Sequence, residues 1–364
     1  MRQIFIGFYG WPAGPEINQD EAVRIIAEGF ECWNLRKFTA SEFVSAIQEK
    51  IPPENPNWLT NYIHTAPERT SQLSEENYGK ALWGLLLPDP QENSGGYTEV
   101  LSLLNLFSME YMHPAFYVTH QGITKVSNFI ERDVQPNDMQ GHEQFKSLDF
   151  VSFFNALIDQ MKYFIWRRDE VVTWGNEDWR LFMATLFYTN LDQYQKSKKA
   201  FTWQRESTDM ATLLETLFTA GDRQTEEIGY RLRKRAAALI GWKFDDIEKE
   251  LKGLYNDRSE FVHGDYYKKI IKEMKKNEHD PAMPLFPDFK KLYKIKERIR
   301  IILIAYLYLH KVRVSGSEPL FQAYTSVQNM LEDSILNIDL RSRIMETIEP
   351  LINKVPLDIS TNVQ

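Results

Sequence analysis

Apolar residues recur every three or four positions through most of the chain beyond residue 147, a spacing that places them on one face of a helix. The predicted helices cover Leu148–Trp166, Asp178–Tyr194, Asp209–Thr219, Glu226–Ile240, a segment opened by Asp245 and Asp246, and the stretch from Asp288 to about Lys311. Two more amphipathic helices are predicted within residues 317–353. The second half of the chain is therefore expected to be almost wholly helical.

The first 140 residues have a different and weaker pattern. Partial alternation predicts a strand over Gln3–Tyr9 and a short one around Phe116–Val118, whereas helical spacing predicts a helix over Asp20–Trp33. The polar segment 126–146 follows and marks a domain boundary. The predicted fold class is mainly α, with a helical bundle preceded by a smaller mixed α/β N-terminal domain. The expected divisions are 1–140, 147–315 for the bundle and 316–364 for a helical tail.

The composition limits which cellular compartment suits the chain and which kinds of chemical site it can form. Cys32 is the only cysteine, so neither an intrachain disulfide nor a thiolate metal cage can form. The longest apolar run without charge, Ile301–Leu309, is about half the length that a membrane helix needs. His310 is placed at the end of the long helix, where it suits the helix dipole. We expect a cytoplasmic protein without a metal site, a cofactor or a membrane partner.

Charge is distributed unevenly along the chain. The net charge is −8, yet residues 231–313 hold 21 Lys+Arg against 12 Asp+Glu. A basic block on an acidic chain is a possible footprint for a polyanion. The alternative is that these charges cover solvated helix faces. No DNA-specific motif accompanies the block.

The segment Leu254–Gly264 carries the candidate chemistry, with four residues between Arg258 and His263. Cleavage of RNA without a metal needs an imidazole to move a proton and a guanidinium to hold the phosphate as charge builds on its oxygens. Five residues of an ideal helix leave two side chains about 140° apart, so the pair converges only if the helix starts or bends here, or if a second subunit completes the site. Alternatively, Arg258 pairs with Asp257 or Glu260, and His263 caps a helix end.

Four sequence blocks occur in a recognisable order, namely Leu213–Phe218, Glu226–Ile228, Leu232–Leu239 and Leu254–Gly264. Together they resemble the Apea-like branch of the HEPN superfamily. The pattern of that branch is a helix with Leu-Glu and Leu-Phe, a helix with Arg-x-Ala, and then Leu-Tyr-x-x-Arg-Ser-x-x-Val-His-Gly. The resemblance covers roughly residues 176–313. It implies a HEPN-like helical bundle and a metal-independent endoribonuclease, in which the RNA 2′-hydroxyl attacks its own neighbouring phosphate.

The resemblance also implies roles for individual residues. His263 would be the general acid/base and Arg258 the phosphate clamp of this hydrolase. Ser259 and Asn256 would assist, and Glu215 would orient Arg258. The family typically forms a homodimer with two motifs across a shared cleft and needs no cofactor. The resemblance to Apea-like proteins suggests a toxin or effector of prokaryotic antiviral defence that acts by abortive infection.

Further residues are predicted to bind RNA around this cleft. They are the basic Arg231, Arg233, Lys234 and Arg235, and the stacking candidates Tyr255, Tyr266 and Tyr267. The alternative is that the basic side chains cover helix packing and that the tyrosines close the core. Two other functions stay open. One is a non-catalytic HEPN module that dimerises or binds RNA or a partner protein, and the other is a nucleotide-binding sensor.

Overall fold

A computed structural model divides the chain into two compact units, Met1–Arg167 and Arg168–Gln364. It describes residues 3–8, 26–27, 30–31, 36–38, 82–88, 102, 106, 114–119, 122–125, 156–164, 171–194, 202–220, 227–263, 265, 268, 271 and 289–355. The division by contacts falls after Arg167, and the second unit includes the described residues 316–355.

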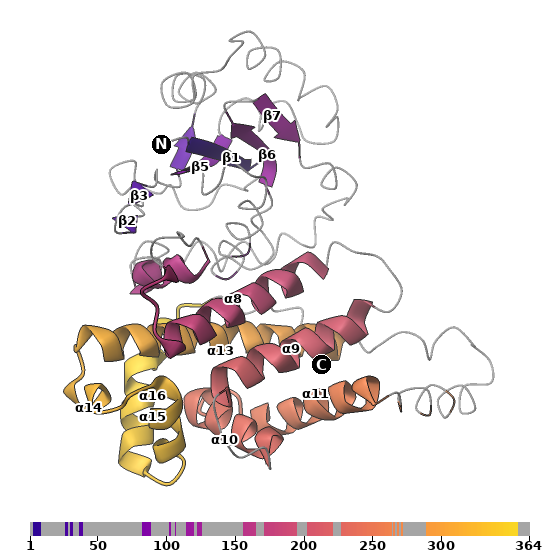
Figure 1. The fold of residues 1–364 in the computed structure, drawn as a ribbon, viewed down its shortest axis with the longest axis vertical. Helices are drawn as coiled ribbons and strands as arrows, with labels where there is room; N and C mark the ends of the chain where they lie inside the picture. Colours follow the sequence, from indigo (N-terminus) through magenta and orange to yellow (C-terminus); the bar gives the residue numbers. More distant parts are fainter. Residues whose placement is uncertain are drawn as a thin grey trace. The chain divides into compact units, whose positions relative to one another are not determined.

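The first unit contains a five-stranded antiparallel sheet in the order β4-β5-β1-β6-β7. Its strands are β1 (Gln3–Phe8), β4 (Arg36–Phe38), β5 (Leu82–Pro88), β6 (Pro114–Thr119) and β7 (Gly122–Lys125). The central strand β1 pairs with β5 from Gln3 opposite Pro88 to Phe8 opposite Trp83. Both strands predicted by alternation, around residues 3–9 and 116–118, lie in this sheet as β1 and β6 (Figure 1).

The helix predicted over Asp20–Trp33 is wrong where the structure describes it. Ile26–Ala27 forms β2 and Phe30–Glu31 forms β3, and the two pair antiparallel. Helical spacing gave the wrong prediction because the structure of such short segments depends on the neighbouring strand with which they pair. The same unit ends with the 3-10 helix η5 (Ile158–Tyr163), which lies within the stretch predicted as an α-helix from Leu148.

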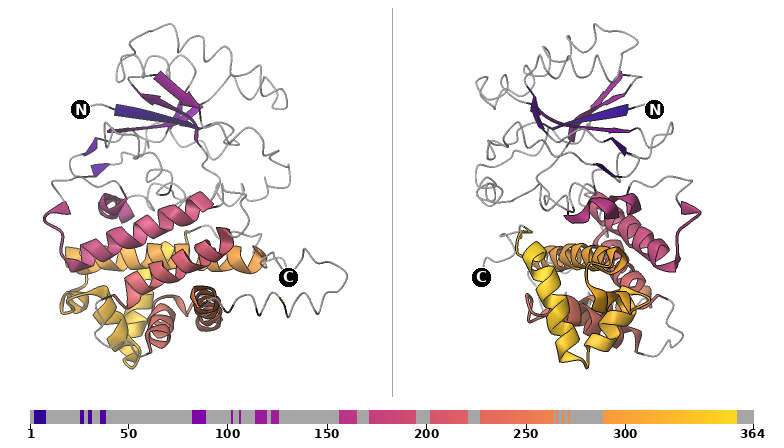
Figure 2. Two further views of the ribbon diagram at one scale, coloured as in Figure 1. Left: turned by 45° about the vertical axis from the view of Figure 1, so that its right-hand side comes forward. Right: turned by 90° about the vertical axis from the view of Figure 1, so that its left-hand side faces the viewer.

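The described residues of the second unit form helices and turns, with no strand among them (Figures 1 and 2). The longer helices are α8 (Asn176–Tyr194), α9 (Thr202–Phe218), α10 (Ile228–Ile240), α11 (Ile247–Val262) and α13 (Phe289–Ser315). They are followed by α14 (Pro319–Gln322), α15 (Val327–Ser334) and α16 (Ile338–Ile352). The C-terminal residues thus form three helices where the sequence predicted two. None of the described helices is long and apolar enough to cross a membrane.

Helix α13 is the centre of this unit. It contacts α8, α9, α10, α11 and α14 to α16, and its residues from Ile299 to Leu307 are almost fully buried. A helix that is apolar all round must be enclosed on every side, which this arrangement provides. Helices α8 and α9 lie side by side along α13, whereas α15 and α16 run across its direction (Figure 2).

Local signals in the sequence fix the ends of several helices. Ser326 caps α15 by accepting a hydrogen bond from the Asn329 backbone N–H at 3.1 Å, and Asn337 caps α16 in the same way. Asp246 is the residue before α11, as its acidic side chain near a helix N-terminus predicted. Helix α10 ends before Gly241, also as predicted.

Candidate active site

Helix α11 carries the motif as one continuous helix that ends beside His263. Ile247, Leu251 and Leu254 form its buried stripe and fix its rotation against α9, α10 and α13. His263 is the C-cap residue, and its backbone N–H still reaches the Ser259 carbonyl at 3.0 Å. The helix therefore does not start or bend between Arg258 and His263.

Arg258 points toward α9. One of its terminal nitrogens lies 3.8 Å from an oxygen of Glu215, and both side chains are about three-quarters covered. The guanidinium carbon also lies 5.8 Å from the centroid of the Tyr255 ring, within the range of a cation–π contact. Asp257, one of the partners considered from the sequence, lies 3.4 Å from Lys291 on α13. The structure thus brings together Arg258 and Glu215, which lie in different helices.

Tyr255 belongs to the same cluster. Burial raises the pKa of its phenol, the negative charge of Glu215 raises it further, and the hydrogen bond to Glu215 acts in the same direction. The positive charge of Arg258 opposes these effects without cancelling them. The phenol is therefore neutral at physiological pH and serves as a hydrogen-bond donor to the carboxylate.

The environment of His263 differs from that of the partly covered Arg258 and Tyr255. Its side chain is exposed at the end of α11, close to exposed Phe261 and Val262. The pKa of nearby Asp265 is held below its usual range, first by the hydrogen bond and charge of Lys268 and to a smaller extent by the charge of His263. His263 thus faces solvent, where a substrate can reach its imidazole.

The geometry of one chain separates the two motif side chains. Because the helix is regular from Arg258 to its end at Val262, five positions turn the side chain by about 140° beyond a full turn. Arg258 faces α9, whereas His263 faces solvent. The two assisting candidates divide similarly, with Asn256 exposed and Ser259 half-buried.

One of the four basic residues of α10 that were predicted to bind RNA, Arg235, is buried instead. Arg235 is 3% exposed, donates to Glu332 at 2.5 Å and also donates to the backbone carbonyl of Phe218. We therefore remove Arg235 from the RNA-binding set, because a buried guanidinium with these partners cannot reach a phosphate in solution. It joins α10 to the end of α9 and to α15.

The other predicted RNA-binding residues are in varied environments. Lys234 pairs with Glu248 at 3.0 Å on the surface, and Arg233 donates through Nε to the Gly229 carbonyl at 2.8 Å. Arg231 is half-buried. Tyr266 and Tyr267 lie outside the described residues.

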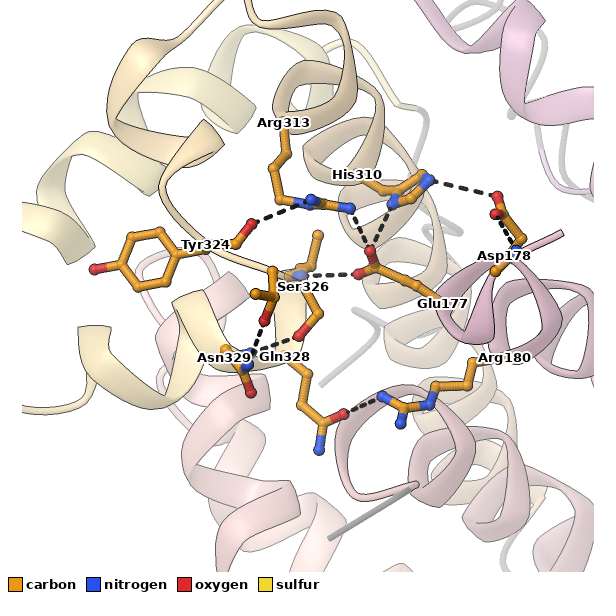
Figure 3. A network of polar contacts seen from close by, with 12 residues as sticks. Glu177, Asp178, Arg180, His310, Arg313, Tyr324, Ser326, Gln328 and Asn329 are labelled. Carbon is orange, nitrogen blue, oxygen red and sulfur yellow. Dashed lines mark hydrogen bonds and ion pairs between the residues drawn. The ribbon is translucent and has the colours of Figure 1, made fainter.

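A second polar cluster joins α8 to α13 and α15 (Figure 3). His310 Nδ1 lies 3.3 Å from one oxygen of Glu177 and its Nε2 lies 3.9 Å from Asp178. Arg313 also binds Glu177, whose other oxygen accepts a hydrogen bond from the Val327 backbone N–H at 2.8 Å. Contrary to the sequence-based placement, His310 lies inside α13, which continues to Ser315.

Carboxylates beside an imidazole are typical of acid–base sites, so this cluster is an alternative candidate. Its accessibility argues against that role, because the His310 side chain is 5% exposed and that of Glu177 is 12% exposed. Both Glu177 oxygens are already engaged. The cluster therefore acts as a structural junction, and the motif on α11 stays the better candidate site.

Comparison with models of known families, with curated proteins and with solved structures found no match to this chain. Within the part of the chain that the structure describes, no group of three or more His, Cys, Asp or Glu residues is placed to hold a metal ion.

Proposed function

We propose that this chain is a HEPN-type endoribonuclease that cleaves RNA by attack of the ribose 2′-hydroxyl on the adjacent phosphate. Arg258 is the phosphate clamp and His263 the general acid/base, and Glu215 orients the clamp. The single observation that carries the proposal is the Arg258–Glu215 ion pair at 3.8 Å, one turn before a solvent-facing His263. A guanidinium fixed by a carboxylate is ready to bind phosphate without first losing side-chain entropy.

The clamp keeps donors for a substrate. The pairing of Arg258 with Glu215 is a single contact through one terminal nitrogen and not a bidentate one, and the Arg258 side chain is 27% exposed. Its Nε is buried without an acceptor among the described residues, so the exposed part of the guanidinium is the part that a phosphate oxygen would bind. A guanidinium that is held by one long contact and stays partly exposed supports an anion site.

The active form is proposed to be a homodimer. The separation of Arg258 from His263 along one helix leaves each chain with half of a working geometry. Phe261 and Val262 are 42% and 53% exposed beside His263, and a second copy packed there would cover them. Arg258 of one copy and His263 of the other would then face the same phosphate.

The first test is cleavage of total cellular RNA by the purified chain in excess EDTA. Arg258→Ala and His263→Ala are each expected to reduce the rate by at least ~100-fold, the order for losing a general acid/base or a charged clamp. Arg343→Ala is the matched control, because Arg343 is a half-exposed arginine on α16 that pairs only with surface carboxylates among the described residues. If both motif variants cut as fast as the wild type, the site assignment is wrong.

The dimer is tested by mixing the two inactive variants. If each site takes Arg258 from one copy and His263 from the other, a mixed dimer contains one intact site, and random exchange restores about a quarter of the wild-type activity. If both residues act within one chain, the mixture stays inactive. The second result, together with a monomeric mass in solution, removes the dimer from the proposal.

A non-catalytic module is the second candidate, favoured by the same divergence of Arg258 and His263 in one chain. Under this alternative, the α11 end and basic α10 bind RNA or a partner protein without cutting. RNA binding by the wild type, with no cleavage and with equal loss of affinity in both motif variants, would support it.

A further inference from the structure

The Tyr255 ring is packed in a way that differs from a platform for RNA bases. It lies against Gly229 of α10, where an added Cβ would come within 3.2 Å of the ring carbons Cδ1 and Cε1. The guanidinium carbon of Arg258 lies 5.8 Å from the ring centroid. A base that stacks needs an uncovered ring face. Contacts with a helix backbone and a guanidinium suit a support better than a stacking surface.

The hydroxyl of Tyr255 extends this cluster to α9. It lies near Glu215, whose charge and hydrogen bonding raise the pKa of the phenol and whose carboxylate pairs with Arg258 at 3.8 Å. Three helices therefore contribute to one arrangement: α9 supplies Glu215, α11 supplies Tyr255 and Arg258, and α10 supplies the flat backbone surface at Gly229. The phenol and the guanidinium thus have the same carboxylate as a neighbour.

We propose that Tyr255 is a positioning residue for Arg258: its hydroxyl holds Glu215 in one orientation, and its ring supports the guanidinium from below. The inference rests on the proposed function in taking Arg258 as the phosphate clamp. It replaces the sequence-based expectation that Tyr255 stacks on a base. Gly229 has a part in the same arrangement, because a Cβ there would come within 3.2 Å of the ring and the ring would have to move.

Tyr255→Phe separates the two roles, because it keeps the ring and removes only the hydroxyl. A positioning role predicts that kcat falls about tenfold with KM unchanged, the order for losing one hydrogen bond to a charged group. A stacking role predicts a wild-type rate for Tyr255→Phe and a raised KM for Tyr255→Leu. The second pattern overturns the inference.

A double-mutant cycle tests whether Tyr255 acts through Glu215. In a Glu215→Gln background, Tyr255→Phe is expected to cause less than a twofold further loss, because the two changes break one chain of contacts. Independent losses that multiply would refute the coupling. Both single variants must also retain the wild-type unfolding midpoint to within a few degrees, which separates positioning from a general loss of structure.

Gly229→Ala perturbs the ring from a residue that touches no substrate. Its Cβ would force the Tyr255 ring to move by a few tenths of an ångström, and a severalfold drop in kcat is expected. Gly253→Ala is the matched control on α11, because its Cβ meets only the end of the Lys291 side chain at 3.6 Å. Equal rates for the two variants would contradict the inference.

A measurement without RNA distinguishes failure of this inference from failure of the proposed function. With tyrosines labelled at Cζ, an NMR pH titration follows the Tyr255 phenol, whose pKa should lie above the ordinary value of 10.0. Glu215→Gln should bring it down, because it removes the negative charge and the carboxylate acceptor. If the wild type does not cut RNA but this shift occurs, the positioning contact stands and only the enzymatic role fails. If the shift is absent, the Tyr255 inference is wrong.

Discussion

Replacing Arg235 with methionine is expected to destabilise the helical unit strongly, although the residue belongs to a stretch of four basic positions that reads as an RNA-binding surface. Methionine keeps the length and the apolar part of the side chain and removes the donors. Those donors join α10 to two neighbours, through Glu332 on α15 and through the Phe218 carbonyl at the end of α9. The variant thus tests packing with little change in volume.

The magnitude follows from the burial of the groups that lose their partner. The Phe218 carbonyl takes part in a buried hydrogen bond, and among the described side chains Arg235 is the donor that it would lose, at a cost of about 1–3 kcal/mol. The Glu332 side chain is 38% exposed and can regain water, which keeps the total near the lower end of the ~3–5 kcal/mol for a broken buried ion pair. A loss of about 3 kcal/mol lowers the Tm of a unit of this size by roughly 6–12 °C.

Thermal unfolding followed by circular dichroism measures this loss, with Lys234→Met as the control on the same helix. Lys234 pairs with Glu248 at the surface, where both side chains are about one-third exposed or more, and its removal should cost less than about 1 kcal/mol. If Arg235→Met keeps the wild-type Tm but lowers the salt dependence of RNA binding, Arg235 contacts phosphate and the packing interpretation is refuted.

Two other changes test the junctions of the helical unit. Burial raises the pKa of Glu177, but the hydrogen bond from His310 and the charges of His310 and Arg313 outweigh it and hold the pKa below 4.5. Its contribution to stability is therefore full at neutral pH, above the unfolded pKa, and is lost as pH falls through the lower folded value. Glu177→Gln should lower the urea midpoint at pH 7 and leave less difference from wild type near pH 3; an equal difference at both values would contradict this. Gly316→Ala should cost about 1–2 kcal/mol, because φ at this position is +73°, a conformation that residues with a Cβ rarely adopt, whereas the nearby Gln322 amide can swing away. An unchanged Tm for this variant would show that the turn relaxes freely.

Local patterns were reliable where a helix is long and has one apolar face. The predicted segments 178–194 and 226–240 lie within two residues of α8 and α10, because apolar spacing and caps act within a few residues of each other. The same spacing failed over Asp20–Trp33, where Ile26–Ala27 and Phe30–Glu31 pair with each other as β2 and β3. Pairing between two segments is a tertiary contact, and apolar spacing within one segment does not report it.

The sequence contained evidence that Arg235 would be buried, but the residue was assigned to the surface because of its charge. It lies three residues after Leu232 and four before Leu239, so it belongs to the apolar stripe of its helix. Charge alone grouped it with Arg233 and Lys234, which lie on other faces of the helix. The sequence determined the stripe, but only the packing of α10 on α9 and α15 supplied the partners that allow a buried guanidinium.

The sequence by itself determined that the C-terminal half is helical, that Arg258 and His263 share one segment, and that five helical positions separate them. Those properties are local, so spacing and residue type were enough. Only the tertiary structure decided that Arg258 turns to α9 and that Tyr255 and Gly229 lie beneath it, because Glu215 is more than forty residues away in the chain. Contacts between helices depend on which faces pack together, and a single helix does not carry that information.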